Sequence, residues 1–217
     1  MQLCRVLPCR RFQSRDMSSP QIAAVILAAG ESTRLGQPKQ LLQFHGKTLL
    51  RRVVDAASEA ACQPILVVVA SNQAESFAIE SELNETDAKV VANPNWKRGI
   101  GTSIRAGAEY LIEVAPEVEG TVLLACDQPF VDSSVISGLI ALRRATGKPV
   151  VASSYGGSLG VPVLFDRAYL PELVGLDERT GAKGIIFANR DRVAELPFPG
   201  GNIDIDTAED WQRLSPT

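Results

Sequence analysis

The chain has 217 residues, of which 45% are hydrophobic and 22% charged, a composition typical of a globular domain with a buried core. Its net charge of −3 argues against a nucleic-acid-binding protein, and no apolar run reaches the roughly 18 residues that a membrane span needs. The chain has four cysteines without a C-x-x-C pair and a single histidine, which argues against a zinc site or a disulfide framework. We therefore expect a reducing, cytoplasmic setting.

Residues 1–20 differ in composition from the rest of the chain. They carry four arginines and one aspartate, and they lack the long apolar segment and the cleavage site of a secretory signal. We expect a disordered tail or a start codon placed too early, with Met17 as the true first residue; an organelle transit peptide is the alternative. We expect residues 21–217 to form one domain, because no repeat or long linker divides them.

The remaining chain alternates short apolar runs with amphipathic segments. In chain order we expect a strand at residues 23–28, a helix at 48–61, a strand at 65–70, a helix at 73–83, a strand at 88–92, a helix at 103–114, a strand at 121–125, a helix at 132–145, a strand at 149–153 and a helix at 207–214. Near-continuous Val, Ile and Leu runs suit strands buried on both faces. Asp132 and Thr207 suit N-caps, and residues 154–164 and 175–184 suit loops or short irregular strands over a second substrate. The pattern predicts an α/β, Rossmann-like domain whose mostly parallel central sheet has helices on both faces.

The first expected strand runs directly into a loop of small residues that carries two cations. Small residues at 28–30 let backbone N–H groups approach phosphate oxygens, and Arg34 and Lys39 offer positive charge. The loop is not a P-loop, because Gly30 and Gly36 are followed by no Lys-Ser/Thr pair, and it has no G-x-G-x-x-G spacing. We therefore predict binding of a nucleoside triphosphate by another kind of phosphate loop.

The segment from Leu27 to Lys39 contains all seven specified residues of the signature L-x-A-G-x-S-x-R-x-G-x-x-K found in nucleotidyltransferases. Further matches are G-I-G-T-S at 99–103, C-D-Q-P at 126–129, G-V-P at 160–162 and D-I-D-T at 204–207. Over about residues 22–214 the chain resembles the molybdenum cofactor cytidylyltransferases, relatives of the molybdopterin guanylyltransferases. The resemblance implies the nucleotidyltransferase fold and a Mg²⁺-dependent reaction.

Carboxylates for Mg²⁺ are expected at two places, because this ion prefers carboxylate and phosphate oxygens. Asp127 follows an apolar run, at the carboxyl end of an expected strand, where open α/β sheets bind ligands. A cap for the next helix is the alternative, but Asp132 suits that purpose better. Alternation along a strand would place Asp204 and Asp206 on one face. We favour Asp206 as the second ligand, with Asp204 as the alternative; a surface or capping role for both also stays open.

The resemblance also implies which residues contact the two substrates. The nucleotide side would comprise Leu27, Ala28, Ala29, Gly30, Ser32, Arg34, Lys39, Asn93, Gly101, Thr102 and Ser103. Arg34, Lys39 and Asp127 would act in catalysis, and Gly160, Pro162 and Lys183 would contact the acceptor. For Ser103, exposed donors at a helix start suit an anion or a ribose, and a plain helix cap is the alternative. We expect Trp96 to be a packing residue.

The chain departs from the family pattern at two places. Val161 stands where many relatives have histidine, and residues 175–184 form a longer spacer than the compact G-D-x-G-A-[KR] of the family. Both departures lie on the expected acceptor side. They leave room for a phosphorylated acceptor other than molybdopterin.

We expect transfer of CMP from CTP to the phosphate of molybdenum-loaded molybdopterin, with release of pyrophosphate. Ala28-Ala29 matches the L-A-A-G form associated with cytidylyl transfer, whereas guanylyltransferases show L-A-G-G; one methyl group is worth about 1–3 kcal/mol of discrimination. The alternatives are GTP as donor, a sugar or polyol phosphate as acceptor, a D-x-D glycosyltransferase, and a non-catalytic chaperone for nucleotide or molybdopterin. A molybdoenzyme or its chaperone would receive the product, and no nucleic-acid or membrane partner is expected.

Overall fold

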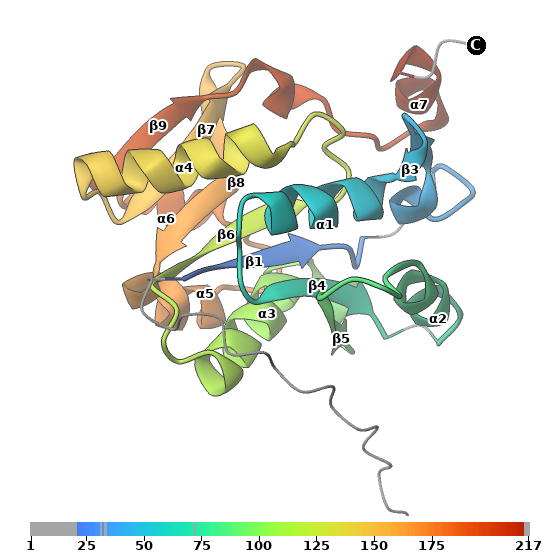
Figure 1. The fold of residues 1–217 in the computed structure, drawn as a ribbon, viewed down its shortest axis with the longest axis horizontal. Helices are drawn as coiled ribbons and strands as arrows, with labels where there is room; N and C mark the ends of the chain where they lie inside the picture. The colour runs from blue at the N-terminus through green and yellow to red at the C-terminus, as the bar shows by residue number, and fades with distance from the viewer. Residues whose placement is uncertain (1–20, 31, 33, 72, 215–217) are drawn as a thin grey trace, which may run out of the picture.

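A seven-stranded sheet forms the centre of the molecule (Figure 1), with strand order β5-β4-β1-β6-β8-β7-β9. The computed structural model describes residues 21–214 other than 31, 33 and 72; the expectations for residues 1–20 lie outside the described residues. The strands of this sheet are β1 (Ile22–Leu27), β4 (Ile65–Ala70), β5 (Lys89–Asn93), β6 (Gly120–Ala125), β7 (Val150–Tyr155), β8 (Ser158–Asp166) and β9 (Val193–Pro197). Strand β8 runs antiparallel to β6 and β7, and the other pairs in the sheet are parallel. A separate hairpin pairs β2 (Gln43–Phe44) with β3 (Lys47–Thr48).

Helices cover both faces of the sheet. They are α1 (Leu49–Glu59), α2 (Gln73–Glu82), α3 (Ile100–Val114), α4 (Ser133–Thr146), α5 (Leu170–Val174), α6 (Lys183–Ala188) and α7 (Ala208–Leu214). Buried side chains of α1 and α4 pack on one face and those of α3, α5 and α6 on the other, as Figure 1 shows for α1 and α4 against α3 and α5. Among the described residues, no helix is long and apolar enough to cross a membrane.

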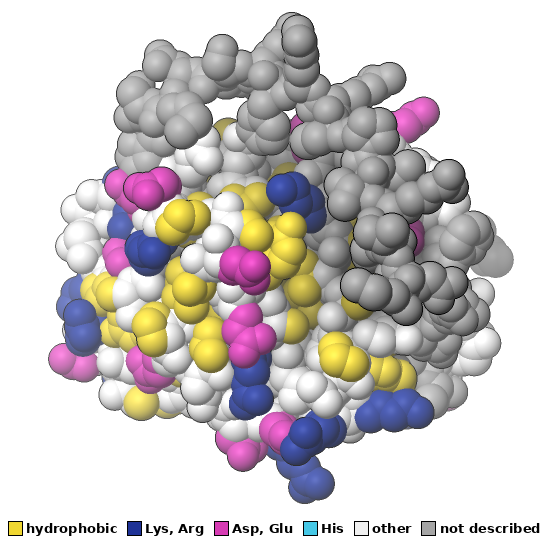
Figure 2. All heavy atoms as spheres, turned by 90° about the horizontal axis from the view of Figure 1, so that it is seen from below, with side chains coloured by type: hydrophobic (Ala, Val, Ile, Leu, Met, Phe, Trp, Pro, Cys, Tyr) yellow, Lys and Arg dark blue, Asp and Glu magenta, His cyan; other side chains and the backbone are white. Residues whose placement is uncertain are grey.

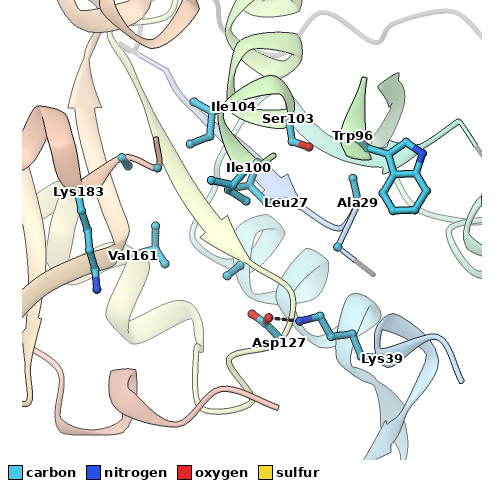
Figure 3. Close-up of a pocket in the computed structure, with 14 residues that line it drawn as sticks. Leu27, Ala29, Lys39, Trp96, Ile100, Ser103, Ile104, Asp127, Val161 and Lys183 are labelled. Carbon is cyan, nitrogen blue, oxygen red and sulfur yellow. Dashed lines mark hydrogen bonds and ion pairs between the residues drawn. The ribbon is translucent and has the colours of Figure 1, made fainter. Parts of the chain in front are cut away.

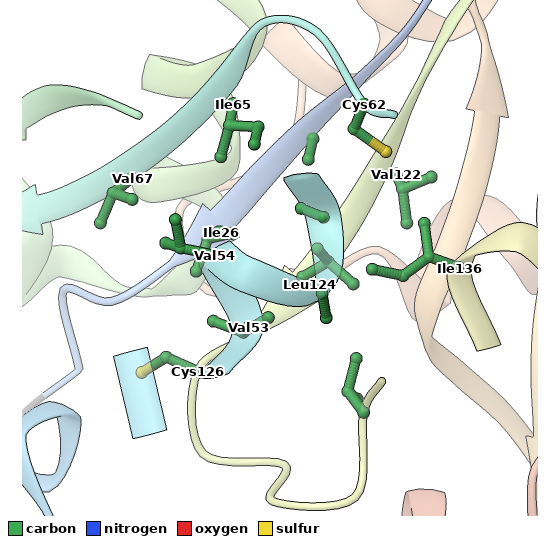
Figure 4. Close-up of a cluster of buried hydrophobic side chains, with 14 of the residues drawn as sticks. Ile26, Val53, Val54, Cys62, Ile65, Val67, Val122, Leu124, Cys126 and Ile136 are labelled. Carbon is green, nitrogen blue, oxygen red and sulfur yellow. The ribbon is translucent and has the colours of Figure 1, made fainter. Parts of the chain in front are cut away.

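The core on the α1 side is built by side chains that strand and helix periodicity bring to one face (Figure 4). Ile26 and Leu124 are fully buried on adjacent central strands, and Val54 of α1 and Ile136 of α4 pack in the same cluster. Burying one such side chain contributes about 1.5–3 kcal/mol. This cluster fixes α1 and α4 against the sheet. On the underside of the molecule, acidic and basic side chains are interspersed with apolar ones (Figure 2).

The structure confirms the α/β class and the mostly parallel sheet between two layers of helices. Both expected N-caps are present: Asp132 Oδ1 accepts from the N–H groups of Ser134 and Val135, and Thr207 Oγ1 accepts from Asp210 N–H. Two expectations were wrong. Most of the stretch expected as a loop or irregular strand at 154–164 belongs to the nine-residue strand β8, and residues 203–206 form a loop without regular secondary structure rather than a strand.

The order of the strands creates a switch point beside β1. From β1 the chain passes to β4 on one side and later to β6 on the other, and Leu27 at the end of β1 pairs with Ala125 at the end of β6. In open α/β sheets, such a point leaves a crevice outside the carboxyl ends of the strands. The chain that follows each strand is therefore directed toward one shared place.

Candidate active site

A cleft of about 370 Å³ lies at this place. It is lined by Leu27, Ala29, Gly30, Lys39, Trp96, Ile100, Ser103, Ile104, Ala125, Asp127, Val161, Gly181, Ala182 and Lys183. Figure 3 shows Asp127 and Lys39 at one border, with Lys183 beside Val161 and Trp96 beside Ala29 on opposite walls. The cleft combines apolar walls with charged groups at its border. Such a cavity suits a ligand that has both a ring system and anionic groups.

The loop after β1 folds back so that Lys39 returns to the end of its own strand. Lys39 N–H donates to Ser32 Oγ (2.9 Å), and Gln40 Nε2 donates to the carbonyl of Ala28 (2.5 Å). Gln40 is buried, with an exposed fraction of 4%. Side chains of this loop therefore fix its path next to Gly30, beside which the Lys39 side chain lies.

Lys39 bridges two carboxylates at the border of the cleft. Its Nζ lies 2.5 Å from Asp127 Oδ2 and 3.1 Å from Asp206 Oδ1, and its side chain is only 10% exposed. Burial alone would lower the pKa of Lys39, but the charge and hydrogen bonds of Asp127, helped by Asp206, raise it above its ordinary value. Lys39 is therefore a fixed positive charge at neutral pH. Arg34 is exposed, and its Nη2 lies 3.8 Å from Asp206 Oδ2.

Three aspartates meet at this border because the 203–206 loop is tied to the end of β6. Ile205 is buried and its N–H donates to the carbonyl of Asp127 (3.0 Å), while Asp204 and Asp206 on either side of it are exposed. The alternation of the two aspartates with Ile205 thus survives without a strand. The pKa of Asp204 is raised to about 6, first by partial loss of water and then by the charges of Asp127 and Asp206. A cation would relieve this repulsion.

The donor set fits a hard divalent cation that brings further ligands with it. A carboxylate offers about four lone-pair sites, and among the described residues Lys39 is the one hydrogen-bond donor to the carboxylate of Asp127. In the described part of the chain, no three His, Cys, Asp or Glu side chains are arranged to hold a metal by themselves. Mg²⁺ usually takes one or two carboxylates and completes its shell with water and substrate phosphates. Asp127 and Asp206 match that requirement.

Two residues expected to contact the nucleotide lie behind the cleft wall instead. Asn93 Nδ2 donates to Thr102 Oγ1 (2.9 Å) and Ser103 Oγ (3.0 Å), and all three side chains are buried. Of the three, only Ser103 lines the cleft. Asn93 and Thr102 fasten the end of β5 to the first turn of α3, so their polar groups already have partners within the protein.

We expected exposed donors at the start of α3, but other parts of the protein cover them. The helix begins at Ile100, and Gly101 N–H donates to the carbonyl of Glu178 (2.9 Å). A Cβ on Gly101 would lie 2.0 Å from the carbonyl oxygen of Asp177, so the loop after α5 approaches closer than a side chain would permit. Gly101 and Thr102 are therefore covered by protein, and Ser103 is not the cap but a residue of the first turn.

The expected acceptor residues surround the wall opposite Trp96. Lys183 lines the cleft together with Val161, whereas Gly160 and Pro162 are buried. The carbonyl of Pro162 accepts from Ser153 Oγ (2.7 Å). A Cβ on Gly160 would lie 2.2 Å from the Tyr155 hydroxyl oxygen, so Gly160 lets two parts of the β7–β8 hairpin approach each other.

Sequence reasoning missed several apolar residues of the walls. They are Trp96, Ile100, Ile104, Ala125, Gly181 and Ala182. Trp96, expected to pack, is half-buried and lines the cleft (Figure 3). Ile100 is 45% exposed, although large aliphatic side chains are usually buried. An isoleucine directly after Gly99 was the available signal for an exposed apolar wall.

Comparison with known proteins identifies the family. Residues 24–193 match the family described as "MobA-like NTP transferase domain". Nicotine blue oxidoreductase of Paenarthrobacter nicotinovorans is 28% identical over 92% of this chain and 98% of its own. Purine catabolism protein PucB of Bacillus subtilis is 27% identical over 91% and 98%. Bifunctional protein GlmU of Bifidobacterium animalis subsp. lactis is 38% identical over 58% of this chain, but this match spans only 27% of GlmU.

Solved structures share the fold. The crystal structure of Rv0371c from Mycobacterium tuberculosis superposes with a TM-score of 0.76 and 29% identity, over 93% of this chain and 100% of the other. A complex of Rv0371c with manganese has a TM-score of 0.72, at 29% identity over 92% and 100%. The family match covers most of the chain, and the fold and the cleft at the carboxyl ends of β1 and β6 agree with it. The chain belongs to the MobA-like NTP transferase domain family and is a nucleotidyltransferase.

Proposed function

We propose that this nucleotidyltransferase transfers CMP from CTP to the phosphate of molybdenum-loaded molybdopterin and releases pyrophosphate. One observation carries the proposal: the protonated Lys39 lies between Asp127 and Asp206 at one border of the cleft, and Lys183 stands at another. These separate cations are available to two anionic substrates. The proposed acceptor also rests on the resemblance in the G-V-P segment and at Lys183.

The chain's own residues would act by positioning and by neutralising charge. Lys39 would bind the triphosphate as a point charge, and its burial limits the solvent that screens it. Arg34, with a side chain 70% exposed, would swing toward the outer phosphates. Asp127 and Asp206 would hold Mg²⁺, which when bound supplies charge neutralisation at the α-phosphate. The acceptor phosphate is already ionised near neutral pH, so no general base is required.

CTP is the proposed donor because Ala29 lines the cleft where the related guanylyltransferase motif has glycine. Trp96 and Ala29 both line the cleft (Figure 3), so the base would meet an aromatic side chain there. The added methyl group would favour the smaller pyrimidine. At the acceptor wall, Val161 offers no side-chain hydrogen bond, which favours another phosphorylated acceptor as the second candidate.

A thermal-shift panel tests the donor. The full chain is heated with CTP, GTP, ATP or UTP, each with and without Mg²⁺. A ligand at about 100 times its Kd adds about 2.7 kcal/mol of stability, so a Mg²⁺-dependent shift largest for CTP is expected. Ala29→Gly should narrow the gap between CTP and GTP by up to ~3 kcal/mol. A larger shift for GTP in the unaltered protein would refute the donor assignment.

Pyrophosphate release with molybdenum-loaded molybdopterin tests the reaction. Asp127→Asn should abolish most turnover at saturating Mg²⁺, because the amide replaces an anionic ligand. Asp132→Asn is the matched control, since Asp132 caps α4 and does not line the cleft. Near-full turnover by Asp127→Asn would contradict the role of Asp127 as metal ligand. If CTP binds but only another phosphorylated acceptor supports release, the second candidate is correct.

A further inference from the structure

A buried glutamine directly after Asp127 joins three parts of the site. Gln128 is 4% exposed, and its Nε2 donates to the carbonyl of Val161 (3.2 Å) and to the carbonyl of Gly201 (2.9 Å). Val161 belongs to the cleft wall that also contains Lys183. Gly201 lies just before the 203–206 loop, which carries Asp204 and Asp206. One side-chain amide thus touches the acceptor wall and the carboxylate loop at once.

The chemistry of the two contacts explains why the residue must be an amide. Both neighbours are carbonyl oxygens, which only accept hydrogen bonds, so an N–H donor must face them. A carboxylate of the same size would place a third acceptor against them, and an apolar side chain would supply no donor. Gln128 Oε1 is buried without a hydrogen-bond partner among the described residues. The same side chain also acts on Asp204: burial and the charges of Asp127 and Asp206 raise the pKa of that carboxyl, and the interaction with Gln128 lowers it.

Neighbouring bonds make the connection stiff. The carbonyl of Asp127 accepts from Ile205 N–H (3.0 Å), which ties the same loop a second time. The carbonyl of Val161 also accepts from the hydroxyl of Tyr155 (2.9 Å). A displacement of the Gln128 side chain would take this donor from the carbonyl of Gly201, whose N–H still donates to Phe198, and would leave the carbonyl of Val161 with the Tyr155 hydroxyl. The loop bearing the aspartates is thus the part that depends most on Gln128.

We propose that Gln128 is a positioning residue that sets the metal and acceptor affinities of this enzyme without contacting the nucleotide. The inference rests on the proposed function, in which Asp127 and Asp206 hold the metal. The nucleotide side has its own buried glutamine, since Gln40 Nε2 donates to the carbonyl of Ala28. Gln40 thus holds the loop proposed to bind the nucleotide, and Gln128 holds the parts proposed to bind the metal and the acceptor. Substitutions at the two positions should therefore affect nucleotide affinity and metal affinity separately.

The test compares Gln128→Met and Gln128→Glu with Gln40→Met. Mn²⁺ affinity in the presence of CTP is measured from the electron paramagnetic resonance signal of free Mn²⁺, and CTP affinity is measured separately with EDTA. Loss of a hydrogen bond behind metal ligands typically weakens metal binding about 10–100-fold. We expect at least a tenfold loss for both Gln128 variants, a raised KM for molybdopterin, and less than a twofold change in metal-free CTP affinity. Gln40→Met should weaken metal-free CTP binding more than Mn²⁺ binding.

Hydrogen exchange of the ligand-free protein separates this inference from the proposed function. The amide of Ile205 should exchange faster in both Gln128 variants than in the unaltered protein and in Thr121→Val, which removes a buried hydroxyl that has no partner among the described residues. Unchanged exchange together with unchanged Mn²⁺ affinity overturns the inference. If the unaltered protein binds neither CTP nor Mn²⁺, the proposed function fails, while exchange still decides whether Gln128 holds the loop. If Gln128→Met does not fold, Gln128→Glu and the shorter amide Gln128→Asn carry the test.

Discussion

Replacing Lys39 by methionine should destabilise the ligand-free protein because it leaves neighbouring carboxylates without their cation. The side chain of Asp127 is 19% exposed and that of Asp206 is 47% exposed, so the two interactions with Lys39 contribute different free energies. A hydrogen bond to a charged group contributes about 1.5–3 kcal/mol, which applies to the sheltered Asp127. The half-exposed Asp206 falls in the range of surface pairs, at about 0–1 kcal/mol. We therefore expect a loss of about 2–3 kcal/mol, since methionine fills most of the vacated volume.

Urea denaturation at pH 7 measures this loss, with Lys47→Met as the matched control. Lys47 also pairs with an aspartate (2.7 Å), but its side chain is 54% exposed, so its loss should be at most ~1 kcal/mol. Added Mg²⁺ should stabilise the Lys39 variant more than the unaltered protein. Equal losses for the two lysine variants would refute the reasoning.

Three further changes test the fold around the site. Burial opposes ionisation of Asp55, but hydrogen bonds from its two basic partners lower its pKa below the ordinary 3.8. The ionised Asp55 should therefore stabilise the fold fully at neutral pH, and this contribution should disappear as pH falls below about 4. Acid denaturation of Asp55→Asn should lack this pH-dependent loss of stability. Gly101→Ala should cost about 1–3 kcal/mol in urea denaturation, because the new methyl group forces the loop at Asp177 to move; an unchanged midpoint would show that the loop yields freely. Asp132→Ala should cost about 1 kcal/mol by removing the cap of α4, and equal thermal stability would contradict this role.

The central strands were predictable because they are buried on both faces. β1, β4 and β6 consist almost entirely of buried apolar residues, and their expected limits differ from the observed ones by at most one residue. β8 was missed because proline and glycine usually interrupt strands, yet Gly160 and Pro162 both lie within it. β9 was missed because it forms a partly exposed edge with little apolar patterning. Pairing partners far apart in the sequence decide such strands, and local composition does not reveal them.

The sequence predicted one site for residues far apart in the chain, and the structure brings two of them together. Lys39 and Asp127 are 88 positions apart; Lys39 was expected as a cation of the loop after the first strand, and Asp127 because it follows a buried strand. Their roles in binding stay predictions. Asn93 and Thr102 were expected to face a ligand because they lie at a strand end and at a helix start. In the structure Asn93 Nδ2 donates a hydrogen bond to Thr102 Oγ1. A sequence shows that a side chain can donate or accept a hydrogen bond. Whether a protein group or a ligand is its partner depends on packing that only the three-dimensional structure provides.

The long spacer before Lys183 illustrates how packing can restore a site that sequence spacing puts in doubt. Relative to the compact family pattern, the extra residues are fixed along α3. The Arg105 guanidinium donates to two carbonyls at the end of α5 and just after it, at 3.0 Å and 2.7 Å. Arg98 pairs with the carboxylate of Glu178, and the carbonyl of Glu178 accepts from Gly101 N–H. Because the loop is held on the helix whose first turn borders the cleft, α6 begins beside that cleft and Lys183 lines it. Insertions at this point can therefore alter this wall of the cleft while Lys183 keeps its place.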